Sequence, residues 1–142
     1  MTKQHWDACT VTEKSIIIAL KVMRWRWLKI DDYIVENAEG IYLVNGVELY
    51  STVHKYRKWN PIEDWNDLQE VITAMNARRL DNFIGQPMLH HVSQCSMGGH
   101  GTGRWTAQLC HDFGYGRMMR ATTMPEAICL AILDAVEPFE DL

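Results

Sequence analysis

The segment from Gly98 to Arg104 is the first candidate for chemistry in this chain. Four of the six residues in Gly98–Gly103 are glycines, and a glycine-rich backbone can turn several N–H groups toward one anion. Arg104 follows directly and can donate two parallel hydrogen bonds to a phosphate or carboxylate. The segment is not a P-loop, because the spacing differs and the Lys-Ser/Thr ending is missing. A plain hairpin loop is the alternative. The residues of the predicted anion site are Gly99, His100, Gly101, Thr102, Gly103, Arg104 and Trp105.

Two further segments, Arg24–Trp27 and Tyr56–Trp59, place aromatic rings beside basic side chains. A Trp or Tyr ring can stack on a nucleobase while Arg or Lys binds the phosphate. We therefore include Arg24, Trp25 and Arg57 in the predicted ligand site. The alternative for the Trp residues is a place in the hydrophobic core.

The histidines and cysteines match no established metal-binding pattern. His90 and His91 are neighbours on a predicted strand, so their side chains point to opposite faces, and no zinc-ligand spacing is present. We predict no metal and no cofactor. His91-Val-Ser and His100-Gly-Thr have the form of phosphodiesterase H-x-S/T units, but they lie only nine positions apart. In the fold that uses such units they lie on separated strands, so a phosphodiesterase is our third hypothesis.

Composition sets limits on the protein class. The 142 residues carry a net charge of −4, which argues against a binder of duplex nucleic acid. No apolar run approaches the roughly 20 residues of a membrane span, and we expect no membrane partner. Four cysteines without a C-x-x-C favour reduced thiols. We predict one domain, residues 1–142, large enough for its own core.

Three helices are predicted to position these residues. The first runs from Val11 to Trp25, because Thr10 and Glu13 have the spacing of a capping box. The second follows Asn60-Pro61, with Asp64 as an alternative cap. Thr123 and Glu126 have capping-box spacing at the start of a third helix, which should be the most buried. Apolar stripes are expected at Ile16, Leu20, Met23 and Trp27, and at Trp65, Leu68, Ile72 and Met75.

The strands are predicted to be antiparallel. Asn45-Gly46 between two β-prone runs indicates a hairpin, and it lies in an insertion of about residues 30–58. Further strands are expected at 88–96, 105–110 and 117–122. Arg117 and Arg120 are expected at the surface on either side of the last strand, where neighbours of the glycine loop could join an anion pocket. Residues 137–142 form an acidic tail that we expect to be loose. The fold class is α+β: an antiparallel sheet flanked by helices, of the α/β/α sandwich type.

The chain resembles the phage ABA sandwich domain family. The matching parts are Leu20–Trp25, Trp59–Asp67, Trp105–Ala107 and Ala121–Ala131, within residues 12–29 and 59–136. The resemblance implies a phage or prophage protein in the host cytoplasm, and it implies no enzymatic activity. The insertion and the glycine-rich loop depart from the family pattern, and insertions on a scaffold often carry function.

These observations lead to two main hypotheses of different classes. In the first, the protein is not an enzyme but sequesters a small anionic, nucleotide-derived host immune signal, as a homo-oligomer that encloses the ligand at a subunit boundary. In the second, it is an interaction module that binds and inhibits a host protein through its acidic C-terminal half and the exposed hairpin.

Overall fold

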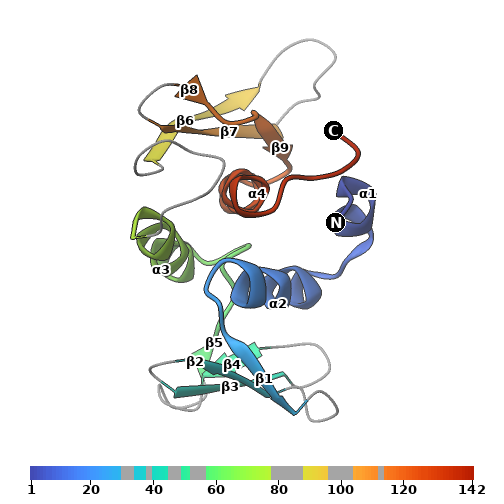
Figure 1. Cartoon of the computed structure of the whole chain (residues 1–142), viewed down its shortest axis with the longest axis vertical. Helices are drawn as coiled ribbons and strands as arrows, with labels where there is room; N and C mark the ends of the chain where they lie inside the picture. The colour runs from blue at the N-terminus through green and yellow to red at the C-terminus, as the bar shows by residue number, and fades with distance from the viewer. Residues whose placement is uncertain are drawn as a thin grey trace.

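Helices lie between two antiparallel sheets in the computed structural model, as Figure 1 shows. The predicted α+β class is confirmed, but the expected sandwich had its sheet between helices, whereas here the helices lie between two sheets. The residues that the structure describes are 1–29, 34–37, 40–44, 49–51, 57–77, 88–95, 104–111 and 114–142. In the described part of the chain, no helix is long and apolar enough to cross a membrane.

The helices are α1 (Lys3–Ala8), α2 (Val11–Lys21), α3 (Trp65–Asn76) and α4 (Met124–Val136). Helix α1 was not expected from the sequence. It is only six residues long, too short for the apolar periodicity that identifies a helix. A side chain stabilises its first turn, because the Thr2 hydroxyl accepts a hydrogen bond from the backbone N–H of His5.

Helix α2 begins at the predicted residue, Val11, but it ends earlier than predicted. Thr10 and Glu13 form both hydrogen bonds of the capping box. The helix ends at Lys21 instead of Trp25, and Arg24 has a φ of 59°, which an α-helix does not accommodate. The expected stripe of Ile16, Leu20 and Met23 is only half-buried. The buried face consists of Ser15, Ile18, Ala19 and Val22.

Helix α3 begins after the alternative cap, Asp64, whose carboxylate accepts from the N–H groups of Asn66 and Asp67. The prediction for Trp65 was wrong, because its side chain is exposed. Asp67 is buried instead, and its carboxylate accepts the backbone N–H of Asn60 at 2.8 Å. That hydrogen bond compensates for burying a charged group.

The first sheet is larger than the predicted hairpin. Its strands follow the order of the chain: β1 (Arg26–Lys29), β2 (Ile34–Asn37), β3 (Gly40–Val44), β4 (Leu49–Ser51) and β5 (Arg57–Lys58). Strands β1, β2 and β5 have two to four residues each, which is too short for clear alternation.

The predicted pairing within that sheet is confirmed at β3 and β4, which are antiparallel. Val44 lies opposite Leu49 across the two strands. The Asn45-Gly46 turn itself lies outside the described residues.

The second sheet consists of β6 (Met88–Cys95), β7 (Arg104–His111), β8 (Gly114–Tyr115) and β9 (Met119–Ala121). Strand β7 is central: it pairs with β6 on one side and with both β8 and β9 on the other. The strands expected at 88–96, 105–110 and 117–122 are thus confirmed, with bounds that differ by one to two residues at most ends.

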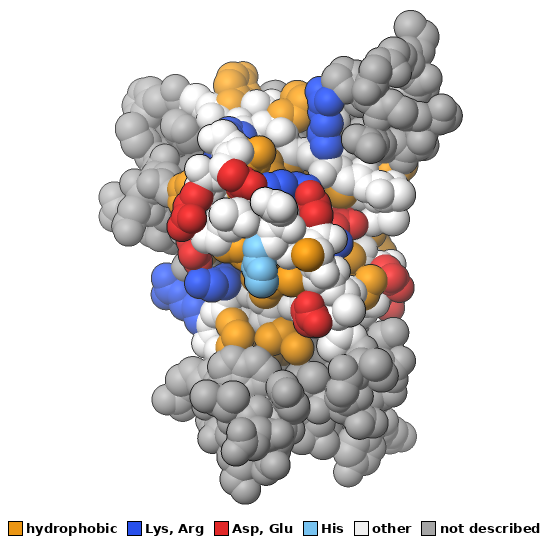
Figure 2. All heavy atoms as spheres, turned by 90° about the vertical axis from the view of Figure 1, so that its right-hand side faces the viewer, with side chains coloured by type: hydrophobic (Ala, Val, Ile, Leu, Met, Phe, Trp, Pro, Cys, Tyr) orange, Lys and Arg blue, Asp and Glu red, His pale blue; other side chains and the backbone are white. Residues whose placement is uncertain are grey.

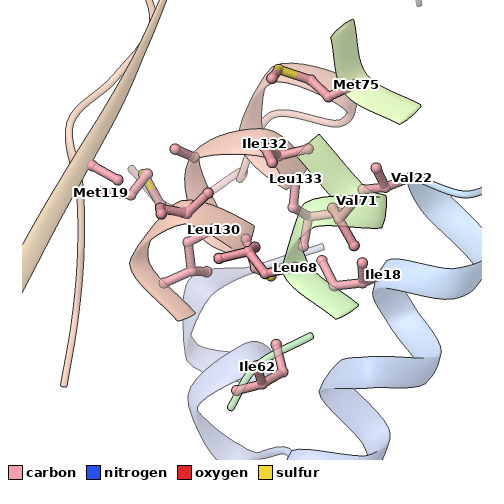
Figure 3. Packing of buried hydrophobic residues seen from close by; sticks show 14 of the residues in the cluster. Ile18, Val22, Ile62, Leu68, Val71, Met75, Met119, Leu130, Ile132 and Leu133 are labelled. Atoms are coloured by element: carbon pink, nitrogen blue, oxygen red, sulfur yellow. The ribbon is translucent and has the colours of Figure 1, made fainter. Parts of the chain in front are cut away.

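Helix α4 is the centre of the core, as predicted. It packs against β7 and β9 on one side and against α2 and α3 on the other. Figure 3 shows Leu130, Ile132 and Leu133 of α4 among side chains of the neighbouring elements. Those neighbours include Ile18, Val22, Leu68, Val71, Met75 and Met119.

Cys129 of α4 lies in this core, and burial raises the pKa of its thiol. The thiols of Cys9, Cys110 and Cys129 are free. The Cys95 side chain lies outside the described residues.

The acidic tail is not loose, contrary to the prediction. Phe139 is buried in the core, and its backbone N–H donates to the Asp134 carboxylate at 2.9 Å. Arg117 donates from both Nε and Nη2 to the same carboxylate, and from Nη2 to the Phe139 carbonyl. Charge composition suggested a solvated tail, whereas one aromatic side chain and one buried carboxylate hold it.

Two other carboxylates attach the tail to the N-terminal helices. Glu137 forms an ion pair with Lys21 at 2.7 Å, and Lys21 lowers the pKa of Glu137 by this hydrogen bond. Asp141 accepts the backbone N–H groups of Lys3 and Gln4 at 2.6 and 3.2 Å. The tail therefore supports α1, and Figure 1 shows the two chain ends side by side.

Candidate functional site

A polar pocket of about 360 Å³ lies where α1, α2, β9 and the start of α4 meet. Its lining holds three cations and two carboxylates, a net charge of +1. Figure 2 shows the side of the molecule that carries α1, where acidic and basic side chains lie intermixed. The lining residues are Lys3, Asp7, Lys14, Arg120, Ala121, Thr122 and Glu126.

Helix α1 supplies Lys3 and Asp7, which lie one turn apart on the same face. The Lys3 ammonium contacts Asp7 Oδ1 at 2.5 Å. Trp6 anchors the helix, because its side chain is fully buried. Asp141 holds the first turn from outside through the backbone of Lys3. The helix that carries these two charged side chains is thus held from the core by Trp6 and from the tail by Asp141.

Lys14 of α2 and Glu126 of α4 form the inner wall. Glu126 Oε1 accepts from Lys14 Nζ at 2.7 Å and from Trp6 Nε1 at 3.0 Å. The two charged side chains are 13% and 15% exposed, so water screens this pair less than a surface pair. Lys14 Nζ also lies 5.5 Å from the centre of the Trp6 ring, within cation–π range.

The predicted capping box at the start of α4 is only half formed. The Thr123 hydroxyl accepts from the Glu126 backbone N–H at 3.4 Å, as expected. The Glu126 carboxylate binds Trp6 and Lys14 instead of the backbone of Thr123. The side chains of Trp6 and Lys14 give the Glu126 carboxylate two donors, one of them charged. A complete capping box would give it only one neutral donor, the backbone N–H of Thr123.

Arg120 completes the pocket from β9, and its side chain is exposed. It lies opposite Thr106 of β7. Of Arg117 and Arg120, both of which were expected at the surface with the possibility of joining an anion pocket, the structure places Arg120 on the lining of this pocket. Arg117, three residues earlier, binds Asp134 instead.

The predicted loop site begins beside this pocket. Trp105 is half-buried and lies opposite Ala121, a lining residue. Arg104 precedes Trp105 on β7, so its backbone lies next to the residue that pairs with Ala121. Gly99, His100, Gly101, Thr102 and Gly103 lie outside the described residues, as does the side chain of Arg104.

The other predicted residues lie elsewhere. Trp25 is 7% exposed and packs against Trp59, with ring centroids 4.6 Å apart, so the predicted stacking on a ligand is corrected to a role in the core. Arg24 is exposed beside it. Arg57 belongs to β5 in the first sheet, whereas Arg104 belongs to the second sheet, on the opposite side of the helices. Within one chain the structure does not bring Arg57 and Arg104 together.

The structure does not describe the side chains on which the phosphodiesterase hypothesis depends. His91 lies on β6 opposite Gln108, and its side chain lies outside the described residues, as does His100. Among the side chains that the structure describes, no group of three or more His, Cys, Asp or Glu residues is placed to hold a metal ion.

Sequence reasoning missed most of this pocket. Lys3, Asp7, Lys14 and Glu126 come from three separate helices, and only the Lys3–Asp7 spacing could have signalled a local pair. Comparison of the chain with family models, with curated proteins and with solved structures finds no match. The resemblance to the phage ABA sandwich domain therefore stays a prediction.

Proposed function

We propose that this protein is a non-catalytic binding protein that captures a small phosphate-bearing ligand in the pocket between α1, α2, β9 and α4. One observation carries the proposal: three cationic side chains from three different elements, Lys3, Lys14 and Arg120, line the same hollow. Its volume of about 360 Å³ lies within the roughly 300–1,000 Å³ of small-molecule sites.

The site is also held in place before a ligand arrives. Lys14 is fixed by Glu126 and by the ring of Trp6, and Lys3 by Asp7. Fixed cations lose little side-chain entropy when an anion binds, which favours affinity. Arg120 adds a planar fork of donors that matches a phosphate. The proposal assigns these groups to binding and gives none of them a role in turnover.

The ligand that we propose is a nucleotide-derived host signal, captured by a phage protein in the host cytoplasm. This finer part is supported by the resemblance of residues 12–29 and 59–136 to phage domains. It is also supported by Arg104 and Trp105, which were expected to bind such a ligand and whose strand pairs with β9, a strand that lines the pocket. A homo-oligomer that closes the open side of the pocket belongs to the same proposal.

The test is a thermal-shift and calorimetric screen with cyclic di- and trinucleotides, ADP-ribose derivatives, mononucleotides and inorganic phosphate. A ligand at 100 times its Kd should add about 2.7 kcal/mol of stability. The variant R120Q replaces the arginine of the lining and should weaken binding at least tenfold, and the Tm of the unliganded variant is measured beside its affinity. The matched control is R24Q, which removes an exposed arginine elsewhere and should leave affinity unchanged.

Three outcomes contradict the proposal. Recovery of a reaction product after denaturation would make the protein an enzyme. Equal affinity in R120Q and the unmodified protein would place the ligand elsewhere. Absence of any shift across the panel would favour the interaction module that inhibits a host protein.

A further inference from the structure

The two carboxylates of the pocket restrict which anions it accepts. Asp7 and Glu126 lie among the three cations, and each repels a phosphate group that comes close. A pocket that bound only bare anions would be better without them. Besides pairing with Lys3 and Lys14, the two carboxylates therefore limit which anions the pocket can hold.

Both hydrogen bonds that the Glu126 carboxylate accepts go to one of its two oxygens. Both the Trp6 indole N–H and the Lys14 ammonium bind Oε1. Among the residues that the structure describes, no hydrogen bond reaches Oε2. Oε2 is not among the buried side-chain oxygens that lack a partner in the described part of the chain. Solvent therefore reaches this oxygen, and a donor on a bound ligand can reach it too.

Asp7 offers a similar group on the opposite, more open wall. Lys3 Nζ binds its Oδ1, and the side chain is 59% exposed. The hydroxyl of Thr122 lies on the same lining and can donate or accept. The pocket thus combines cations for a phosphate with acceptors for O–H groups.

We propose that the pocket selects phosphate monoesters of polyhydroxylated compounds, such as a pentose phosphate, over bare phosphates and polyphosphates. The inference rests on the proposed function and narrows its ligands to mononucleotide-like compounds, because cyclic di- and trinucleotides and ADP-ribose carry phosphodiester or pyrophosphate groups and no phosphate monoester. The phosphate lies against Arg120 and Lys3, and a hydroxyl donates to Glu126 Oε2. The net charge of +1 suits one phosphate group of about −1.5 to −2, and a chain of several phosphates meets the two carboxylates.

The size of the pocket agrees with this ligand class. A volume of about 360 Å³ lies near the lower end of the range for small-molecule sites. It fits a sugar phosphate, which is one part of a nucleotide, better than a whole dinucleotide. In a nucleotide-derived ligand, the base would then lie outside the pocket described here.

The test compares three probes on the full chain by calorimetry at one ionic strength: ribose 5-phosphate, methyl phosphate and pyrophosphate. We expect ribose 5-phosphate to bind at least about tenfold more tightly than methyl phosphate, the effect of one hydrogen bond to a charged acceptor. In E126Q this preference should fall to about twofold or less, while pyrophosphate binds more tightly because a repelling charge is gone. R120Q should weaken all three probes by a similar factor.

A second variant guards against misfolding. If E126Q lowers the Tm of the free protein, D7N at the exposed wall replaces it and should reduce the same preference in part. If methyl phosphate binds as tightly as ribose 5-phosphate, this inference fails and anion capture stands. If no probe binds and R120Q changes nothing, the proposed function fails as well.

Discussion

Replacing Asp134 by alanine should loosen the C-terminal tail and destabilise the whole domain. The Asp134 carboxylate is 8% exposed and binds the Arg117 guanidinium through both of its oxygens. It also accepts the backbone N–H of Phe139 at 2.9 Å. One side chain therefore connects α4, the approach to β9 and the tail.

The size of the effect follows from what each partner loses. The buried Phe139 N–H would lack an acceptor, which costs about 1–3 kcal/mol. Arg117 is 37% exposed, so water replaces much of its lost partner and its share is below about 1 kcal/mol. Adding both, we expect D134A to reduce the free energy of unfolding by about 3 kcal/mol, roughly 10 °C in Tm.

Urea unfolding followed by tryptophan fluorescence measures this change, and limited proteolysis of the tail reports where it acts. The matched control is D134N, which keeps an acceptor for the Phe139 N–H and should cost clearly less than D134A. A loss below about 0.5 kcal/mol, the usual limit for surface substitutions, would refute the assignment of Asp134 as the residue that holds the tail. Equal losses in both variants would show that charge, and not the hydrogen bond to Phe139, dominates.

Two further predictions concern the backbone and pH. Arg24 has a φ of 59°, which is costly for a residue with a Cβ, so R24G should raise stability by about 1 kcal/mol; an unchanged or lower midpoint in urea would contradict this. Lys21 lowers the pKa of Glu137, so this carboxylate stabilises the fold above its unfolded pKa and loses that effect as pH falls through its folded pKa. The unmodified protein should therefore have a higher Tm than E137Q at pH 7, and the two values should converge in acid; a constant difference would contradict the ion pair.

Features that depend on a few adjacent residues could be predicted from the sequence. Thr10 and Glu13 form their capping box because both partners lie within one helical turn. The alternation from Trp105 to Leu109 identified β7, because a half-buried strand has a period of two. The apolar run in α4 identified the most buried helix.

Features that depend on residues far apart in the chain could not be predicted from the sequence. Glu126 was expected to complete a local cap, and instead it binds partners 112 and 120 positions away. Phe139 lies in a charged segment, and its burial depends on Asp134 and Arg117 together. The pocket has the same origin: each of its charged residues is ordinary in its own segment, and only the packing of α1 and α2 beside β9 and α4 brings them together.

The Trp25–Trp59 contact has a consequence for how this scaffold can vary. The chain leaves the helices at Trp25 and returns at Trp59, and the two rings pack against each other. The five-stranded sheet is therefore an insertion whose first and last residues lie close together. Exchanging it for a shorter or longer segment costs little closure entropy, about 0.6 kcal/mol for each doubling in length. Because the pocket is built by α1, α2, β9 and α4, such an exchange would leave its lining residues intact.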